Sequence, residues 1–596
     1  MIPEEEGASG FTPRAVVIAL LLTVFLLVTS SYIALKIGAL PWPIIFSVVA
    51  AGALLQLVSR VSGKASPHEM NVAQAGGTIG GLIASGVVFT IPGILYLQSK
   101  GVIVTMPSAA ALAAVCVAAG VLGVLLSVPL RRVFIDEEKL PYPSGTAGAG
   151  VIRAQSHMGR DTFLVALALS LAGMFVLLRE ALFPAGWSFP LAPELGLALA
   201  VYPMPMAVGI GYLLGHKASV NSWFSGSFIG WVVLIPLMAM LGLAAPGDGA
   251  AIVQNAGMGV VIGAGIGFFF SYVVPRARRI FLPLFRWKGM PWYTKMTPAF
   301  SVVAFAVLSL SGVHPLASAI AVLGVWVMVS VAGMMTGETD IDPLEQFGII
   351  VGLLALGAFA ALGMQLGYLS AFLIVCFVSV ASAVAGDIGH DYKSAKLIGT
   401  RAKDIIKVDM LAVIAAGLLA PFVLGMIMDA YGPQFFTPAM PAPQAQMVAG
   451  SIFGFPYPWA FLMGFAVSFI WVVLENLSGK RAPVLPMVFG IGLFLGLALG
   501  IMLAIGGIAR YLTDRRSPGM FAAAGIVLAA GIMGGESVAG LSLKALLVAG
   551  APPLASDLAL SAAFVLLLAL AIAAWRRAKG NKARELVSSF PGRTRH

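Results

Sequence analysis

One polar segment, residues 135–154, interrupts a sequence that is otherwise strongly apolar. Its two prolines exclude a regular helix at the start, Tyr142 and Ser144 offer hydroxyl groups, and Gly145 allows close approach by a ligand or another helix. Charged and hydroxyl groups between apolar spans are costly unless the backbone is buried in protein or lines a wet cavity. The segment therefore predicts an internal polar path, or alternatively a cytoplasmic loop that leads into a short helix capped by Ser144.

A second polar segment, residues 386–396, follows directly on an apolar run. It holds two carboxyl groups, a histidine, a tyrosine and two lysines: Asp387, His390, Asp391, Tyr392, Lys393 and Lys396. If the segment is helical, its two acids are four residues apart and lie on one face. Such a cluster could bind a charged substrate or relay protons, because histidine titrates near neutral pH. A solvated loop with ion pairs is the alternative.

Two further segments place polar groups inside apolar spans. Glu536 lies deep in a glycine-rich region, and an intramembrane carboxyl group predicts a functional role, here proton coupling, unless Glu536 only begins a helix. Asn71 and Gln74 lie three residues apart at the start of another span, where they either line a pore or join helices by hydrogen bonds. An acidic turn, residues 338–345, offers only oxygen ligands, which is too unspecific to predict a metal site.

These segments must be positioned by membrane-spanning helices. The chain of 596 residues is 59% hydrophobic and 10% charged, with a mean hydropathy of +0.97, whereas soluble domains carry about 25% charged residues. Apolar stretches long enough for a helical span recur from end to end, for example residues 15–35, 102–128, 252–274, 408–428 and 558–575. The pattern predicts an all-α polytopic membrane protein with about sixteen transmembrane helices.

The positive charge follows the pattern of membrane topology rather than of nucleic-acid binding. The net charge of +11 comes from lysines and arginines in short loops after every second span, whereas the loops between carry single lysines, Lys36 and Lys100. The positive-inside rule then places the N-terminus and the basic C-terminal tail in the cytoplasm. We expect a multi-pass protein of the cell (plasma or inner) membrane whose first span is retained. Cys116 and Cys376 lie in apolar spans and predict no disulfide.

An internal repeat indicates a duplicated architecture. Residues 205–215 match residues 486–496 at seven of eleven positions, with an offset of 281 that is nearly half the chain. We expect two sequence-related halves of about eight transmembrane helices each, residues 1–290 and 291–596, as in secondary transporters whose binding site lies between the halves. Basic residues flank the apolar stretch 485–510 on both sides, which a single span would not allow, so parallel and inverted halves both stay open.

Together these segments resemble the oligopeptide transporter (OPT) family, which includes the yellow stripe-like metal–chelate transporters. Residues 138–147 are similar to the family's Leu-Pro-Tyr-Pro-Ser-Gly pattern followed by small residues. Residues 32–38, 69–74 and 535–537 resemble the end of its first span, its Glu–Asn–Gln segment and its late Gly-Glu-Ser/Ala element. Residues 387–396 resemble its Gln-Asp-Leu-Lys-Thr-Gly-Tyr signature loosely, with Ser394 and Ala395 in place of Thr-Gly.

The resemblance, closest to the prokaryotic branch, implies secondary active transport coupled to protons, with oligopeptides or small peptide-like metal chelates as substrates. We expect no enzymatic activity, no cofactor and no resident metal. The expected partners are the substrate, protons and the lipid bilayer, with no nucleic acid; the oligomeric state stays open, with a homodimer as one option. The predicted substrate-binding residues are Asn71, Gln74, Tyr142, Ser144, Gly145, Tyr392 and Lys393. The predicted proton-coupling residues are Asp387, His390, Asp391 and Glu536.

Two other classes of membrane protein fit parts of the pattern. An ion-pumping pyrophosphatase also has about sixteen spans, but binding pyrophosphate with several Mg²⁺ ions needs many clustered carboxylates, and the 25 acids of this chain are scattered. A channel would need neither the buried acids nor the duplication, which favour alternating access instead. Release of phosphate from pyrophosphate would support the first alternative, and uptake against a gradient would exclude the second.

Overall fold

The fold is a bundle of membrane-spanning helices. The computed structural model describes residues 7–38, 43–153, 158–183, 187–192, 197–244, 248–278, 292–339, 342, 344–437, 440–479, 482–516 and 520–588. Within these ranges, fourteen helical segments are long and apolar enough to cross a membrane, and three apolar helices are shorter: Phe46–Ser59, Thr297–Leu310 and Pro486–Leu495. The prediction of an all-α polytopic membrane protein is confirmed, with one antiparallel hairpin added to it.

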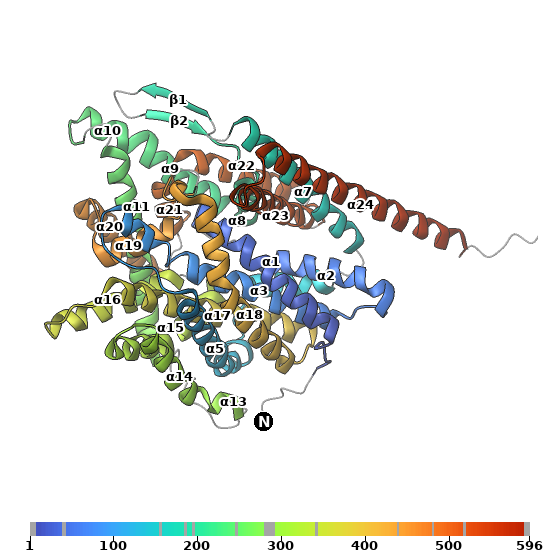
Figure 1. Cartoon of the computed structure of the whole chain (residues 1–596), viewed down its shortest axis with the longest axis horizontal. Coiled ribbons are helices and arrows are strands. Elements are labelled where there is room, and N and C mark those ends of the chain that lie inside the picture. The colour runs from blue at the N-terminus through green and yellow to red at the C-terminus, as the bar shows by residue number, and fades with distance from the viewer. Residues whose placement is uncertain are drawn as a thin grey trace, which may run out of the picture.

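The elements follow one another along the chain as labelled in Figure 1. Up to the middle of the chain they are α1 (Pro13–Ile37), α2 (Pro43–Ser62), α3 (Pro67–Val88), α4 (Gly93–Ser99), α5 (Ala109–Arg131), η1 (Arg132–Glu137), α6 (Pro143–Arg153), α7 (Met158–Leu182), β1 (Trp187–Ala192), β2 (Leu197–Val201), α8 (Pro205–His216), η4 (Lys217–Phe224), α9 (Ser225–Phe228), η5 (Ile229–Leu234), α10 (Ile235–Met240), α11 (Asp248–Phe268), η6 (Phe269–Val273) and η7 (Val274–Arg276). The remainder are α13 (Trp292–Lys295), α14 (Thr297–Leu310), α15 (Pro315–Thr339), α16 (Leu344–Ala361), α17 (Tyr368–Ile398), α18 (Ala402–Tyr431), η9 (Gly432–Gln434), α19 (Pro443–Phe453), α20 (Pro458–Ser478), α21 (Pro486–Leu495), α22 (Leu497–Arg516), α23 (Met520–Val548) and α24 (Pro553–Ser588).

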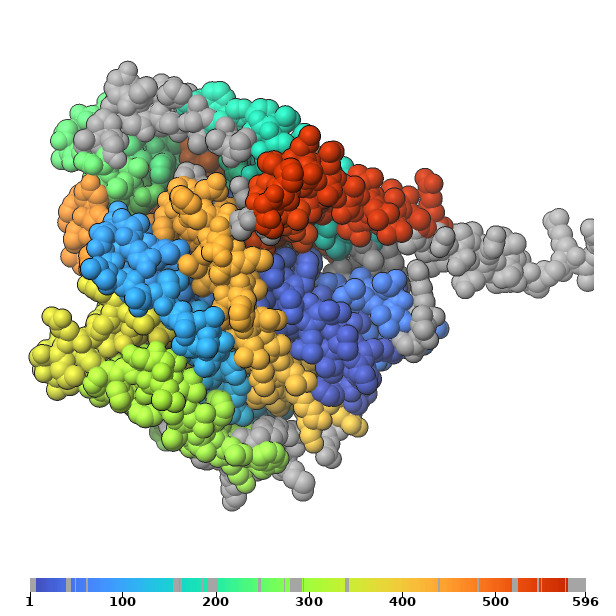
Figure 2. All heavy atoms as spheres, viewed as in Figure 1, coloured from blue at the N-terminus to red at the C-terminus, as the bar shows by residue number. Residues whose placement is uncertain are grey.

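Helices α3 and α17 form the centre of the bundle. In the most apolar part of each, 94% of the residues are buried inside the protein, against 11% in α24, which extends beyond the other helices (Figure 1). Helix α3 packs against α1, α2, α17 and α18, while α17 also packs against α5, α15 and α16. Figure 2 shows α18, in orange, crossing the middle of one face beside the blue helices. Polar groups on α3 and α17 are therefore enclosed by protein rather than lipid.

Small residues let the central helices approach closely. A Cβ atom at Gly80 of α3 would overlap the carbonyl oxygen of Thr23 on α1, and one at Gly76 would overlap Ala19 on α1 and Val408 on α18. Thr23 uses the space by donating a hydrogen bond to the Gly76 carbonyl oxygen at 2.8 Å. Close packing of backbone on backbone is the usual use of glycine in membrane helices, and it fixes α3 against two neighbours at once.

The two copies of the repeated segment share a break in the backbone. Gly215, near the end of α8, has φ 73° and ψ 171°, and Gly496, which follows α21, has φ 86° and ψ 177°. Positive φ with extended ψ is accessible to glycine but strained for other residues. The stretch 485–510 is therefore divided between two helices, α21 and α22, rather than forming one continuous helix.

The broken segments also contact one another reciprocally. A Cβ atom at Gly211 of α8 would meet the backbone of Leu503 in α22, and one at Gly492 of α21 would meet the backbone of Trp223 in η4, the segment after the first break. Each copy thus packs its first piece against the second piece of the other. This arrangement is compatible with related halves, residues 1–290 and 291–596, which stay a prediction.

Candidate functional site

A layer of polar side chains lies at one depth in the central helices. Gln74 is seven residues from the start of α3, Asp391 is seven from the end of α17, and Asp409 is seven from the start of α18. These helix ends adjoin, because His68 Nδ1 lies 3.2 Å from Thr400 Oγ1 in the turn between α17 and α18. Seven helical residues rise about 10 Å, so the layer lies well below the end of the bundle that we predict to face the cytoplasm.

Asp391 is held by neutral groups from α3. Gln74 Nε2 donates to Asp391 Oδ1 at 2.6 Å and Thr78 Oγ1 donates to Asp391 Oδ2 at 3.2 Å. Beside them, Asn71 Nδ2 donates to Ser394 Oγ at 2.7 Å. Asn71, Gln74, Thr78, Asp391 and Ser394, which we call the amide–carboxyl cluster, are each at most 1% exposed. A carboxyl group with neutral partners in a dry setting is suited to taking up and releasing a proton.

The Pro-Tyr-Pro motif, residues 141–143, packs against α15 and α17. Tyr142 has φ 41°, its N–H donates to the Gly337 carbonyl oxygen at 2.9 Å, and its hydroxyl donates to the Gly333 carbonyl oxygen at 2.7 Å. The Gly145 N–H donates to His390 Nδ1 at 3.1 Å. Helix α6 begins at Pro143, so Ser144 lies in its first turn and the alternative in which Ser144 caps the helix is wrong.

The remaining predicted residues of α17 connect that helix to its neighbours. The Tyr392 hydroxyl lies 3.0 Å from Ser127 Oγ on α5, and Lys393 Nζ donates to the Leu140 carbonyl oxygen at 2.7 Å. Asp387 Oδ1 is 3.8 Å from His390 Nε2, a distance too long for a hydrogen bond. The structure thus brings together ten of the eleven predicted residues around α17, while their roles in binding and proton coupling stay predictions.

Asp342 adds a further acid beside this group. Both of its carboxyl oxygens are shielded from solvent and have no hydrogen-bond partner among the described residues. Its Oδ2 would lie 2.6 Å from a Cβ atom at Gly386, next to Asp387. Burial, together with the charges of Asp387 and Glu345, raises the pKa of Asp342 well above its usual range.

Gly389 provides a test of how tightly the motif is docked. A Cβ atom at Gly389 would overlap the ring of Tyr142, whose hydroxyl is fixed by its bond to Gly333. We expect Gly389→Ala to destabilise the protein by about 1–3 kcal/mol, the usual cost of overpacking. Gly425→Ala, in a helical position with open space, is the control and should be neutral or stabilising. Equal apparent melting temperatures for the two variants would contradict this docking.

Glu536 lies apart from the amide–carboxyl cluster, in a second buried site. It is 0% exposed and accepts hydrogen bonds from Arg179 Nη1 at 2.9 Å and from the Met206 N–H at 2.8 Å. Because α23 begins at Met520, the alternative in which Glu536 begins its own helix is wrong. Its carboxylate instead meets the first turn of α8, where the dipole of that helix favours a negative charge.

Lys36 belongs to the same region and corrects an expectation from sequence. It lies in the last turn of α1 and is 4% exposed, rather than in a loop. Its Nζ is 5.6, 5.7 and 5.9 Å from the ring centres of Tyr32, Tyr202 and Tyr431. Ring faces at such distances stabilise a cation, so a lysine is tolerated at this depth.

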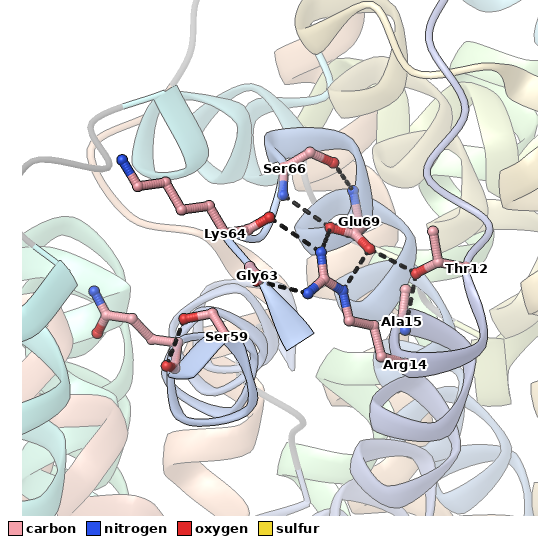
Figure 3. Close-up of polar contacts among 9 residues, drawn as sticks. Thr12, Arg14, Ala15, Ser59, Gly63, Lys64, Ser66 and Glu69 are labelled. Carbon is pink, nitrogen blue, oxygen red and sulfur yellow. Dashed lines mark hydrogen bonds and ion pairs between the residues drawn. The ribbon is translucent and has the colours of Figure 1, made fainter. Parts of the chain in front are cut away.

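Glu69 holds the starts of α1 and α3 together, as Figure 3 shows. Arg14 donates from Nε to Glu69 Oε1 at 2.7 Å and from Nη2 to Oε2 at 2.6 Å. Thr12 Oγ1 also donates to Oε1 at 2.7 Å, and the Ser66 N–H donates to Oε2 at 2.9 Å. Ser66 and Glu69 form a capping box. Glu69 is thus a structural residue that fixes the start of α3, two residues before Asn71 and five before Gln74.

Replacing Glu69 with glutamine should loosen this junction. The variant loses the bidentate, charge-assisted pair with Arg14, and such bonds contribute about 1.5–3 kcal/mol. Glu137→Gln is the matched control, because the side chains of Glu137 and Arg132 are 46% and 44% exposed and exposed pairs contribute at most about 1 kcal/mol. Thermal unfolding in detergent compares the two. If Glu69→Gln loses no more thermal stability than Glu137→Gln, the structural role of Glu69 is contradicted.

The family model for OPT oligopeptide transporter protein matches residues 10–276 and 280–548. The chain belongs to the OPT oligopeptide transporter family. A curated "Putative oligopeptide transporter" of Haemophilus influenzae (strain ATCC 51907 / DSM 11121 / KW20 / Rd) is 29% identical over 217 residues. That match covers 35% of this chain and 32% of the relative, so the chain spans about a third of the length of the curated relative it matches. The OPT resemblance predicted from the four polar segments is confirmed.

Two buried charged residues of this OPT family member, Asp409 and Arg179, were not predicted as site residues from the sequence. Asp409 lies inside the predicted span 408–428, and its acid in an apolar window was the available signal. Arg179 lies near the end of α7 and is 3% exposed, but no sequence pattern indicates that it meets Glu536. Partners separated by several helices are not encoded in local hydropathy.

Proposed function

We propose that this OPT family member is a secondary active transporter of oligopeptides or small peptide-like metal chelates, driven by protons. The observation that carries the proposal is the buried Asp391 carboxyl group, which is held by Gln74 and Thr78 between the two most enclosed helices. An intramembrane acid at such a position is a functional site by default. The matched relative's name, which refers to an oligopeptide transporter, supports the substrate class.

The roles of individual residues follow from chemistry and position. Asn71 and Gln74 offer amide groups to a peptide backbone, and the Asn71 Oδ1 atom has no hydrogen-bond partner within the described part of the chain. Asp391 takes up the coupled proton, with His390 and Asp387 on the same helix toward the motif. Tyr142, Ser144, Gly145, Tyr392 and Lys393 shape the adjoining wall. Glu536 is assigned to proton coupling less directly, because Arg179 already neutralises it.

The pyrophosphatase alternative fits the site less well. Pyrophosphate chemistry with several Mg²⁺ ions requires carboxylates gathered around the metal. In the described ranges, no group of three or more His, Cys, Asp or Glu side chains is placed so that it could hold a metal ion. We also propose that both termini face the cytoplasm at the cell membrane, as the distribution of basic loops indicates.

Ligand-induced stabilisation tests the substrate class. The detergent-purified protein is melted with a panel of di- to hexapeptides and metal chelates, because binding to the folded state stabilises it by about 2.7 kcal/mol at a hundred times the Kd. We expect a selective rise with peptides in the wild type and a smaller rise in Gln74→Ala. Stabilisation by metal chelates alone would move the proposal to the yellow stripe-like substrates. No stabilisation by any member of the panel would contradict the proposed substrate class.

A further inference from the structure

Asp409 is a buried carboxyl group without a hydrogen bond. It is 0% exposed, and neither oxygen has a hydrogen-bond partner among the residues that the structure describes. The neighbouring turns of α18 supply apolar side chains, including Ile405, Ala412 and Val413, which are all 0% exposed. An isolated carboxylate ion in such surroundings costs several kcal/mol or more, which favours the neutral, protonated form of Asp409.

The charged group that acts on Asp409 is Asp391. Both carboxyl groups lie in the polar layer, where α18 packs on α3 at Val408 and Gly76, so the charge of one can act on the other. Asp391 accepts a hydrogen bond from Gln74 Nε2 at 2.6 Å. Its other oxygen is 3.2 Å from the Thr78 hydroxyl, which also donates to the Ala75 carbonyl oxygen at 2.6 Å. Asp409 has no donor among the described residues. Two neighbouring acids in a dry space do not both ionise, and they titrate as a pair. The hydrogen bond from Gln74 favours the negative charge on Asp391.

Basic groups near the layer are directed elsewhere. The titratable groups of the surrounding helices include the following, each given with a contact: Arg14 and Glu69, paired with each other; His68, with Thr400; Arg131, over the ring of Tyr392; Tyr392, with Ser127; His390, with Gly145 and Asp387; Lys393, with Leu140; Lys396, with Asp136; Asp404, with Ser9 and Gly10; and Lys407, over the ring of Phe11. None of these contacts reaches Asp409. No basic group among the described residues donates a hydrogen bond to Asp409.

We propose that Asp409 and Asp391 together form a two-carboxyl proton-binding site, with the proton on Asp409 in this conformation. Proton uptake converts one carboxylate to a carboxylic acid, and release returns it, with no other bond made or broken. That this proton is the one coupled to transport rests on the proposed function. The existence of the site does not, since it follows from burial, the missing partners and the neighbouring charge.

Infrared difference spectra of the purified protein between neutral and alkaline pH test the site directly. A protonated carboxyl group gives a carbonyl stretching band that vanishes on ionisation. We expect Asp409→Asn to remove the equivalent of one such group, whereas Asp429→Asn, at an exposed position of the same helix, leaves the spectrum unchanged. A spectrum of Asp409→Asn identical to the wild type would overturn the proposal.

Asp391→Asn provides a second readout should Asp409→Asn fail to fold. Removing the neighbouring negative charge favours ionisation of Asp409, so the band should vanish at lower pH than in the wild type. An unchanged pH dependence would show that the two groups are not coupled and would likewise overturn the proposal. Either spectrum is obtained without substrate, so it decides the site even if no transport is found.

Vesicle assays then test coupling. In Asp409→Asn we expect accumulation driven by a proton gradient to fall at least tenfold, while exchange of substrate across the membrane without a gradient is kept. Accumulation at the wild-type level would overturn the coupling role. If the wild type itself does not accumulate substrate, the proposed function fails, whereas the proton site still stands or falls by its infrared band.

Discussion

Arg179→Gln is expected to lower the free energy of unfolding by about 3–5 kcal/mol, the cost of leaving a buried charge without its partner. The side chains of Arg179 and Glu536 are 2% and 0% exposed and lie 2.9 Å apart. Arg179 Nη2 also donates to Glu180 Oε1 at 2.8 Å, so the variant leaves two carboxylates with less compensation. Apparent melting temperatures in detergent, with the yield of folded protein, measure the loss.

A double variant separates charge from packing in this experiment. Arg179→Gln/Glu536→Gln leaves no unpaired charge between the two positions and should recover most of the lost stability. Arg510→Gln is a control, because the Arg510–Asp514 pair is 25% and 47% exposed and exposed pairs contribute at most about 1 kcal/mol. If the double variant is as unstable as Arg179→Gln, the loss comes from packing and the ion pair is not its cause.

Asp391→Asn is expected to reduce proton-driven uptake to the level of empty vesicles. Asparagine keeps the size of the side chain and can bond to Gln74 and Thr78, but it cannot take up a proton. The folded protein and its thermal stabilisation by substrate should therefore persist. Uptake into proteoliposomes at two pH values measures the effect, with Asp136→Asn as the control, since Asp136 is 32% exposed. Uptake that keeps its wild-type rate and pH dependence would remove Asp391 from the mechanism.

Glu536→Gln needs a different interpretation. It leaves Arg179 buried with fewer negative partners, so lost transport could result from lost stability rather than lost proton coupling. Transport by the folded double variant Arg179→Gln/Glu536→Gln distinguishes the two causes. Proton-driven accumulation in that variant would assign Glu536 a structural role.

The sequence predicted the class of protein and most members of the cluster, but not their partners. Hydropathy identified the spans, because a helix that crosses a bilayer needs a long apolar run. Asn71, Gln74 and Asp391 were predicted in separate segments, and the bond between Gln74 and Asp391 joins positions 317 residues apart. Such contacts depend on how helices pack, which one sequence does not specify.

Two features could not be predicted from hydropathy, because hydropathy is averaged over a window of many residues. Asp409 lies in a window whose other residues are apolar enough to mask one acid. The breaks at Gly215 and Gly496 lie in apolar, glycine-rich runs, and glycine is compatible with either a helix or a positive φ. Hydropathy therefore does not reveal where such a run breaks.

Accumulation of a peptide in proteoliposomes, with and without an imposed proton gradient, is the decisive test of proton-driven peptide transport by this protein. The peptide is the one that stabilises the purified protein most. Proton-driven transport should accumulate the peptide above its external concentration when the gradient is present, and should only equilibrate it when a protonophore collapses the gradient. Equal uptake in the two conditions, or no uptake beyond empty vesicles, would contradict a proton-driven peptide transporter.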